Sequence, residues 1–331
     1  MSQRVLVTGG CGFAGHHLVE HLLKNTDWHI VVMDRLNYAS NGFDRLRDIQ
    51  CFESRRVTVL AADFTQEFGQ GVRQEIGTVE SIFHLGAETH VDRSIDDPEP
   101  FVISNVVGTM RMLDFAKTQK SLKRFFYFST DEVFGPAPKG VAYKEWDRYN
   151  SGNPYAAAKA GGEELCLAYA NTYKVPVVIT HCMNIFGERQ HPEKFIPLVM
   201  RKVLKGEKVF VHSDATKSIP GSRYWIHARN VAAAILFLYK SAEVGEKYNI
   251  VGEKEVNNLD IAKFVAKTLG KPLNYELVDF HSSRPGHDLR YALDGSKMNQ
   301  MGWSIPKSFE DSLERTIKWF IEHPKWLEIA G

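Results

Sequence analysis

The sequence is poor in cysteine, with four among 331 residues. They are Cys11, Cys51, Cys166 and Cys182. Their spacing fits neither a metal site nor the disulfide framework of a small secreted domain, so we expect reduced thiols and no bound metal. A predicted strand begins within a few residues of Met1, which leaves no room for a signal peptide. These features together predict a cytoplasmic protein.

Long hydrophobic runs and an excess of one charge are also missing. The longest apolar stretch, 231–239, is too short to span a bilayer. Lys and Arg number 41 and Asp and Glu 40, so no overall field would favour nucleic acid or an anionic membrane as a partner. Repeats and low-complexity segments do not occur. The remaining composition is that of an ordinary globular protein, long enough to bury a large core.

The amino-terminal region has the pattern of a dinucleotide-binding unit. A strand at 5–7 leads directly into TGGCGFAG, residues 8–15, and an amphipathic helix; a second strand at 30–33 ends in Asp34. Glycines let the backbone approach a pyrophosphate, the helix N-terminus attracts its charge, and the acid meets the adenosine ribose. Asp34 would repel a 2′-phosphate, which favours NAD over NADP, although Arg35 beside it weakens the preference. The expected contacts are Gly9, Gly12, Phe13, Ala14, Gly15 and Asp34.

Short β-rich runs alternate with amphipathic helices, including one at 101–118, as far as residue 180. This alternation predicts an α/β fold with a doubly wound parallel sheet of the Rossmann type, covered on both faces. The third strand ends near Asp63 and Phe64, a predicted adenine contact. The strand at 82–85 runs into small residues that let the backbone pass close to the cofactor. The cofactor-binding set therefore also includes Asp63, Phe64, Leu85 and Ala87, and further along the chain Tyr155 and Lys159.

A strand at 125–128 ends in FSTDEVFG, residues 128–135, which places a hydroxyl and two carboxylates where an open parallel sheet binds its ligands. Tyr155 and Lys159 follow on one helix, a turn apart. A tyrosine can act as a base at neutral pH if a cation such as Lys159 lowers its pKa. It could then take the proton of a sugar hydroxyl while Thr130 hydrogen-bonds the same oxygen and a nicotinamide accepts the hydride.

Asp131 and Glu132 supply groups that a plain dehydrogenase does not need. One can remove the acidic proton next to a new ketone and the other can protonate a leaving hydroxyl, since an apolar site separates the pKa values of two carboxylates. Neighbours on a regular strand point to opposite faces, so this requires the chain to turn at Asp131. A structural alternative remains open, because Tyr-x-x-x-Lys occurs on many helices and Asp-Glu after a strand is commonly a cap or a solvated loop.

The alternation loosens after about residue 180, which divides the chain. Residues 1–183 are predicted to form the NAD-binding domain, with a return segment near 226–251. Residues 184–331 are predicted to form mainly a smaller α/β domain that binds the substrate. Within the return segment, 231–239 is apolar enough to be a helix packed on the main domain.

The segment 212–224 is predicted to be a long loop. Its Arg223, together with Arg284 further along the chain, could clamp a diphosphate, because guanidinium groups suit phosphate oxygens. Solvated loop arginines are the alternative.

These motifs resemble those of the extended short-chain dehydrogenase/reductases, and within them most closely the dTDP-glucose 4,6-dehydratases. The similarity runs nearly from end to end. Its motifs are residues 8–15, HVDRSI at 90–95, STDEVFG at 129–135, NPY at 153–155 with Lys159, PEK at 192–194 and RPGHD at 284–288. The Thr-Asp-Glu triplet at 130–132 is the most discriminating, since related 4-epimerases do not usually carry both acids there.

The resemblance implies a complete reaction. Tyr155, helped by Lys159 and Thr130, would oxidise C4 of a nucleotide-activated hexose, with NAD as the hydride acceptor. Glu132 would remove the C5 proton while Asp131 protonates the departing C6 hydroxyl. Return of the hydride to C6 would give a 4-keto-6-deoxy sugar.

The resemblance also implies partners. The substrate would be a nucleotide-diphosphate hexose, and the helices at 101–118 and 155–173 would form a homodimer. The residues expected to bind the substrate are Ser94, Asn184, Lys194, Arg223, Arg284 and His287.

The sequence departs from the family where His181 replaces an arginine, where 212–222 is longer, and where 252–255 replaces a Gly-x-Asn-Glu segment. The last two changes lie where the family holds the nucleotide, so the base stays open. Two other functions also stay open. An NAD-dependent nucleotide-sugar 4-epimerase would leave Asp131 and Glu132 without a task, and a non-catalytic nucleotide sensor would not need the intact tyrosine and lysine.

Overall fold

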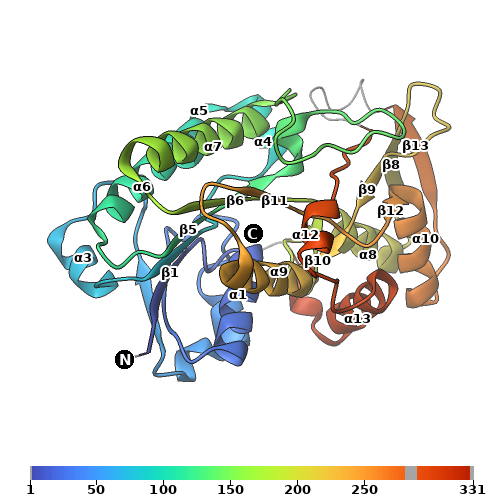
Figure 1. Ribbon diagram of the computed structural model, residues 1–331. Helices are drawn as coiled ribbons and strands as arrows, with labels where there is room; N and C mark the ends of the chain where they lie inside the picture. The colour runs from blue at the N-terminus through green and yellow to red at the C-terminus, as the bar shows by residue number, and fades with distance from the viewer. Residues whose placement is uncertain (1, 280–288, 329–331) are drawn as a thin grey trace.

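The computed structural model describes residues 2–279 and 289–328. Its central element is a seven-stranded parallel sheet with the order β11-β6-β5-β4-β1-β2-β3 (Figure 1). Its strands are β1 (Arg4–Thr8), β2 (His29–Asp34), β3 (Val57–Ala61), β4 (Ser81–His84), β5 (Arg124–Thr130), β6 (Val177–Cys182) and β11 (Lys247–Ile250). The order steps outward in both directions from β1 and β4, which confirms the predicted doubly wound α/β fold.

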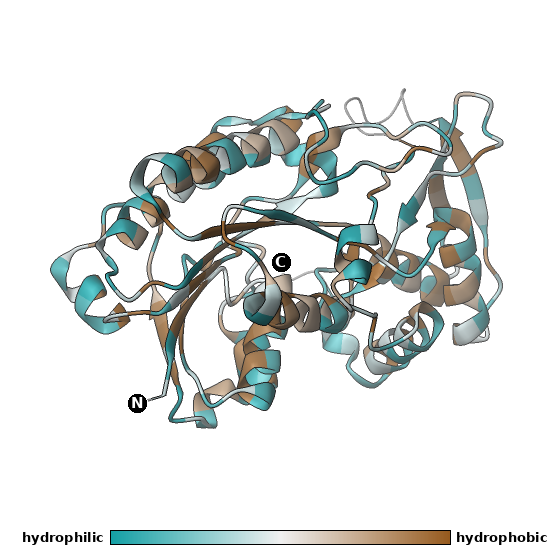
Figure 2. Ribbon diagram, viewed as in Figure 1, coloured by the Kyte–Doolittle hydropathy of each residue, from teal (hydrophilic) through white to brown (hydrophobic). Residues whose placement is uncertain are grey.

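Helices cover both faces of this sheet because alternate strand residues point to opposite sides. Val5 and Val7 face the layer formed by α1 (Phe13–Asn25) and α9 (Ala228–Ser241). Leu6 faces the layer formed by α3 (Gln70–Ile76), α6 (Gly108–Thr118) and α7 (Pro154–Tyr173). Figure 1 shows α6 and α7 above the sheet and α1 and α9 below it, and Figure 2 shows apolar residues concentrated along the strands between them.

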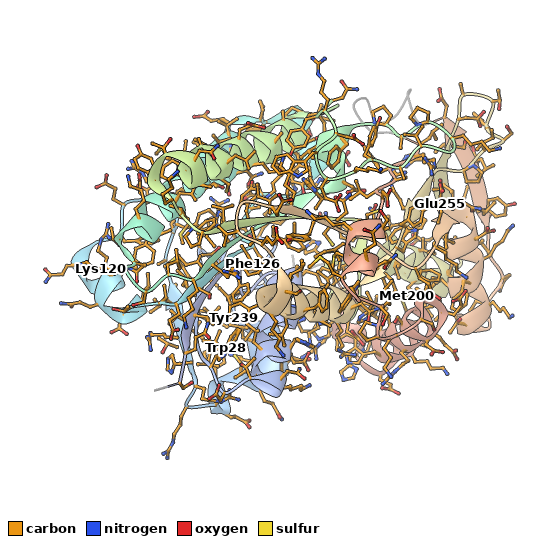
Figure 3. All side chains as sticks on the ribbon, in the orientation of Figure 1. Trp28, Lys120, Phe126, Met200, Tyr239 and Glu255 are labelled. Carbon is orange, nitrogen blue, oxygen red and sulfur yellow. The ribbon has the colours of Figure 1, made fainter. Side chains whose placement is uncertain are left out.

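The segment at 231–239 returns to the main sheet, as the sequence predicts. It lies within α9, which packs on α1. Figure 3 shows Tyr239 of α9 close to Trp28 and Phe126 beneath the sheet, and the rings of Tyr239 and Trp28 are 4.6 Å apart. Immediately after α9, β11 pairs with β6 and completes the edge of the sheet.

The predicted helix at 101–118 forms in three parts, α5 (Glu99–Val102), a π-helical turn (Ile103–Val107) and α6. The backbone stays right-handed helical across both joints, so the three parts form one rod. Shorter helices in the same half of the chain are α2 (Asp44–Asp48) and α4 (Val91–Asp96).

The rest of the chain forms a smaller α/β unit at one end of the sheet (Figure 1). Its strands pair two by two: β7 (Ile185–Phe186) with β10 (Ile226–His227), β8 (Val209–Ser213) with β13 (Tyr275–Asp279), and β9 (Ser222–Tyr224) with β12 (Glu255–Asn257). Its helices are α8 (Phe195–Lys205), α10 (Asn258–Leu269), α12 (Ser296–Gln300) and α13 (Phe309–Glu322). Met200 lies in its core, near the centre of this unit in Figure 3.

The prediction of one long loop over 212–224 is wrong in part. This stretch contains the end of β8 and all of β9. The three residues of β9 pair with β12, which lies about thirty positions further along the chain, so the local composition carries no sign of the strand.

No helix of the described residues is long and apolar enough to cross a membrane. All four cysteines are buried and free of disulfide bonds.

We expect Ile235→Ala to lower the free energy of unfolding by about 2–5 kcal/mol, because Ile235 is buried in the core shared by α9 and the sheet. Ile321→Ala is the matched control: its side chain is 50% exposed on α13, and the loss should be about 0.5 kcal/mol or less. Urea denaturation measures both. Equal, small losses would show that α9 contributes little to the main core.

Candidate active site

A cavity of about 340 Å³ lies outside the carboxyl ends of the central strands, which is where open parallel sheets bind ligands. Residues from both halves of the chain line it. The predicted site residues that line it are Gly9, Gly12, Phe13, Ala14, Gly15, Asp34, Phe64, Leu85, Ala87, Thr130, Asp131, Glu132, Tyr155, Lys159, Asn184 and Lys194. The five residues predicted to react therefore share one cavity with most of those predicted to hold the cofactor.

The glycine-rich turn leaves room that side chains would fill. A Cβ at Gly15 would lie 2.0 Å from the Gly9 carbonyl oxygen, and Gly9 has a positive φ of 69° with a Cβ position 2.7 Å from the Gly86 nitrogen. Gly12 is the N-cap of α1, with no side-chain cap and no acidic residue in the first turn. The positive end of α1 is thus open toward the cavity, which fits a pyrophosphate.

The acid at the end of β2 is held in place by the backbone. The Asp34 carboxylate accepts hydrogen bonds from the Cys11 and Leu36 amides at 3.0 and 2.9 Å. Arg35, whose charge weakened the preference for NAD, is paired with Glu88, and Asn37 donates to the same carboxylate oxygen at 2.8 Å. Because Glu88 neutralises Arg35, the residues at this end fit the adenosine ribose of NAD better than a 2′-phosphate.

The chain turns at Asp131, as the chemistry predicted from the sequence requires. β5 ends at Thr130, and a 3-10 turn over Asp131–Phe134 follows. Thr130 caps this turn by accepting a hydrogen bond from the Glu132 amide, and its hydroxyl lies 3.1 Å from Asp131 Oδ1. Glu132 Oε2 accepts a hydrogen bond from Asn153 at 3.1 Å. The turn allows both acids to line the cavity.

The two acids lie in different surroundings. Burial, and then the charge of Glu132, raise the pKa of the Asp131 carboxyl to about 7, against the opposing effect of Arg223. Asp131 Oδ2 is buried and has no hydrogen-bond partner among residues 2–279 and 289–328. A carboxyl in this state holds a proton near neutral pH, while Glu132 keeps a hydrogen bond that suits a carboxylate.

The prediction that Lys159 lowers the pKa of Tyr155 is not met in this structure. Burial, followed by the charge of Glu132, raises the pKa of Tyr155, and only a hydrogen bond with Thr130 opposes them. Lys159 instead donates to the Phe128 carbonyl at 2.7 Å. Burial lowers the pKa of Lys159 to about 8, against the charge of Glu163.

Ser94 and Asp63 have local structural partners instead of lining the cavity. The hydroxyl of Ser94 donates to the Val91 carbonyl and accepts from the Tyr155 amide, so it anchors the start of α7. Asp63 accepts from the Thr65 amide. Two further predicted residues, Arg284 and His287, lie outside the described residues.

Arg223 binds backbone carbonyls near the site. Its guanidinium donates to the carbonyls of Ser222 and Leu289, both at 2.7 Å, and lies over the ring of Tyr291 at 4.6 Å. Arg223 is not among the residues that line the cavity. Its positive charge nevertheless acts on Asp131, whose pKa it lowers against the effect of burial.

The structure adds residues at the rim that sequence reasoning missed. Glu193 lies 3.6 Å from His90 and 3.7 Å from Arg93. Arg93 stacks over Tyr38 at 3.6 Å. Glu193 and Tyr38 line the cavity. Glu193 lies in the PEK motif and His90 in the HVDRSI motif. The sequence therefore identifies both motifs, but only the fold shows that these two side chains lie close together.

This arrangement defines a class of protein. Extended short-chain dehydrogenase/reductases combine four features that this structure has. They are an all-parallel Rossmann sheet, a glycine-rich turn, a tyrosine and a lysine four residues apart on one helix, and a carboxy-terminal unit that closes the site. The family model for GDP-mannose 4,6 dehydratase matches residues 6–316. The chain therefore belongs to this 4,6-dehydratase family.

Individual relatives agree with that assignment. A dTDP-glucose 4,6-dehydratase of Escherichia coli is 33% identical, over 98% of this chain and 94% of the relative. The low-salt glycan biosynthesis protein Agl12 of Haloferax volcanii is 36% identical, over 96% and 98%. These matches confirm the resemblance found in the motifs.

Solved structures give the same picture. The dTDP-glucose 4,6-dehydratase DesIV of Streptomyces venezuelae, solved with NAD bound, is 34% identical with a TM-score of 0.89, covering 98% of this chain and 99% of that one. A UDP-glucuronic acid 4-epimerase of Bacillus cereus is 26% identical with a TM-score of 0.86, covering 97% and 100%. Epimerases thus share the fold, while identity is higher to the dehydratases.

The raised pKa of Asp131 predicts a pH-dependent stability. In the folded state the pKa of Asp131 is about 7, whereas its ordinary pKa is 3.8. Between these two pH values the unfolded chain loses this proton first, so the free energy of unfolding decreases as the pH rises from about 4, and the decrease is complete above about pH 7. We expect Asp131→Asn to be more stable than wild type by about 2–4 kcal/mol at pH 8 and no more stable at pH 3.5. Urea denaturation at the two pH values measures the difference.

Asp214→Asn provides a control of opposite sign. Hydrogen bonds from Thr216, Ile219 and Ser218 lower the pKa of Asp214 to about 2, so its contribution to stability is present above pH 3.8 and is lost as the pH falls through 2. This variant should be less stable than wild type at pH 8. If Asp131→Asn were also less stable at pH 8, the buried-acid account would be wrong.

Proposed function

We propose that this protein is an NAD-dependent nucleotide-sugar 4,6-dehydratase, a hydro-lyase that converts a nucleotide-diphosphate hexose into the 4-keto-6-deoxyhexose. The observation that carries the proposal is the pair of acids on the turn after β5, which share the cavity with Thr130, Tyr155 and Lys159. Membership of the 4,6-dehydratase family supports it.

The first step is removal of the C4 hydroxyl proton. Tyr155 is the base, and Thr130 donates a hydrogen bond to the same sugar oxygen as the ketone forms. The glycine-rich turn and Asp34 would hold NAD in this cavity, where it would supply the hydride acceptor for C4 and the hydride donor for C6. Lys159, fixed by the Phe128 carbonyl, adds a positive charge on the same face of α7.

The second step is elimination of water. The C4 ketone acidifies the C5 proton, and the Glu132 carboxylate removes it. Asp131 gives its proton to the C6 hydroxyl, which leaves as water, and a double bond forms between C5 and C6. After the hydride reaches C6, Glu132 returns its proton to C5. The sugar has then lost one water with no net oxidation. Tyr155 has gained one proton and Asp131 has lost one, so a proton passes back from Tyr155 to Asp131 before the next turnover. Asp131 thus starts each cycle in the protonated form that its surroundings favour.

The remaining parts of the proposal concern partners. We assign substrate contacts to Asn184 and Lys194, which line the cavity beside the acids. A cytoplasmic homodimer fits the apolar side chains exposed on the α5–α7 layer, including Val102, Ile103 and Tyr173. Two of the relatives named above are dTDP-glucose 4,6-dehydratases, and we propose that the substrate of this protein also carries dTDP.

We expect Gly15→Ala to abolish NAD binding, because its Cβ would meet the Gly9 carbonyl and push apart the turn that holds the pyrophosphate. Gly71→Ala on α3 is the control, since nothing lies within 4 Å of its Cβ position. NAD released by acid from the purified proteins measures occupancy. Full occupancy in Gly15→Ala would contradict the assignment of the turn.

We expect Glu132→Gln to lower the dehydration rate by about 10²–10⁴-fold, because the base for the C5 proton is lost. Deuterium uptake at C5 from heavy water should fall with it. Glu164→Gln, one residue beyond the buried face of α7 and exposed, is the control and should keep both. A variant at Glu132 that still turned the sugar over would favour the 4-epimerase, which needs neither acid.

A further inference from the structure

A buried polar cluster lies behind the reacting residues, and the proposed reaction does not use it. At its centre is Glu163 of α7, which is fully buried. Ser129 of β5 and Tyr149 each donate a hydrogen bond to this carboxylate. His181 of β6 lies 3.0 Å from it and Lys247 of β11 lies 3.6 Å from it.

The position of Glu163 connects it with the reacting residues on both neighbouring elements. Tyr155, Lys159 and Glu163 are spaced four residues apart on α7, so they share one face of the helix. That face lies against the end of β5, where Lys159 binds the Phe128 carbonyl, Glu163 binds the Ser129 hydroxyl and Tyr155 meets Thr130. Three consecutive strand residues are thus tied to three successive turns of the helix.

Hydrogen bonds fix the orientation of the side chains in this cluster. The Asn249 amide nitrogen donates to the carbonyls of Tyr143 and Asp294, so its oxygen faces His181 Nδ1 at 2.9 Å. His181 Nε2 faces Glu163. Both ring nitrogens of His181 therefore lie beside side-chain oxygen atoms that can accept a hydrogen bond.

The carboxylate of Glu163 lies between cations from several elements. Burial alone would raise the pKa of Glu163, but His181 and then Lys247 hold it at about 2. On its own helix, Lys159 and Cys166 lie near it. Burial lowers the pKa of Lys159 to about 8, and the charge of Glu163 opposes this lowering. The carboxylate is therefore ionised throughout the working pH range and acts on a lysine next to the reacting tyrosine.

We propose that Glu163 and Ser129 are positioning residues for the dehydratase reaction: their hydrogen bond fixes the register between the end of β5 and the face of α7 that carries Tyr155 and Lys159. The inference rests on the proposed function. Ser129 immediately precedes Thr130, Asp131 and Glu132, so a shift of β5 along α7 would move the hydroxyl and both acids relative to Tyr155. Misplacement by about 1 Å is enough to cost roughly 10²-fold in rate.

The same cluster links the site to the segment that returns from the carboxy-terminal unit. Lys247 is buried on β11 and donates to Tyr149 as well as contacting Glu163. Asn249, two residues further along β11, holds His181. The edge strand β11 thus supplies Lys247 as one countercharge for the buried carboxylate, and Asn249 to orient His181 of β6.

Ser129→Ala is the principal test, because it removes only the hydroxyl and leaves Glu163 paired with His181 and Lys247. We expect kcat to fall about 10–100-fold with KM within twofold, since no substrate contact changes. Ser129→Thr keeps a hydroxyl and should recover most of the rate. Ser81→Ala is the matched control, a fully buried serine at the opposite end of the sheet; it should lose similar thermal stability but keep kcat within twofold.

A second variant tests the effect of the Glu163 charge on Lys159. In Glu163→Gln the alkaline limb of the kcat profile should move to lower pH, by on the order of one unit, because Lys159 loses the charge that favours its protonated form. If this variant does not fold, because Lys247 and His181 are left unpaired, Ser129→Ala decides alone.

The outcomes separate the two proposals. If wild type does not release water from any nucleotide hexose, the proposed function fails. If wild type turns over and Ser129→Ala matches it within twofold, or if Ser81→Ala loses as much rate, the positioning role is wrong. A rise in KM with unchanged kcat would also overturn it.

Discussion

The hydrogen bond from Lys159 to the Phe128 carbonyl joins the two elements on which the site depends, α7 and the end of β5. It is made in a buried setting, where an ammonium group without a partner would be strongly destabilised. The parallel sheet makes this contact possible, since a parallel sheet must be covered on both faces and α7 is part of one cover. The reacting groups are thus supported by the main core of the molecule.

Several ionisable side chains of the site are buried, where an unpaired charge is unfavourable. Each of them is stabilised in a different way. Glu163 is ionised because two cations face it. Burial and the charge of Glu132 outweigh the charge of Arg223 at Asp131, so this carboxyl holds a proton instead. Arg35 is neutralised by Glu88 at the rim of the cavity. One stretch of chain can therefore present a carboxylic acid and a carboxylate side by side, as an elimination of water requires.

Much of the fold follows from local sequence patterns. The glycine turn and the acid after β2 lie within one strand-helix-strand unit, and the alternation of strands and helices continues to about residue 180. The structure confirms the doubly wound sheet that these patterns predict. The sequence shows that the chemistry requires a turn at Asp131, but a strand pattern alone does not say where the strand ends. The five reacting residues all lie between positions 130 and 159, so their motifs could be recognised together.

Features that depend on distant pairing were missed. The local sequence predicts a loop where β9 forms, because the partner strand β12 lies far along the chain. The sequence also does not predict that the guanidinium of Arg223, a candidate diphosphate contact, donates to the carbonyls of Ser222 and Leu289. The direction of the pKa shift at Tyr155 depends on burial, which a helical spacing does not reveal. The cluster around Glu163 joins α7 to β5, β6 and β11, and only the fold brings those strands together.

The central claim is that this protein removes one water from a nucleotide hexose using NAD that it already holds. The direct test is mass spectrometry of the purified protein incubated with dTDP-, UDP-, GDP- and CDP-hexoses without added cofactor. The account predicts that one member loses the mass of a single water and that the product carries a 4-keto group. A sugar that isomerises with unchanged mass would contradict it and identify an epimerase.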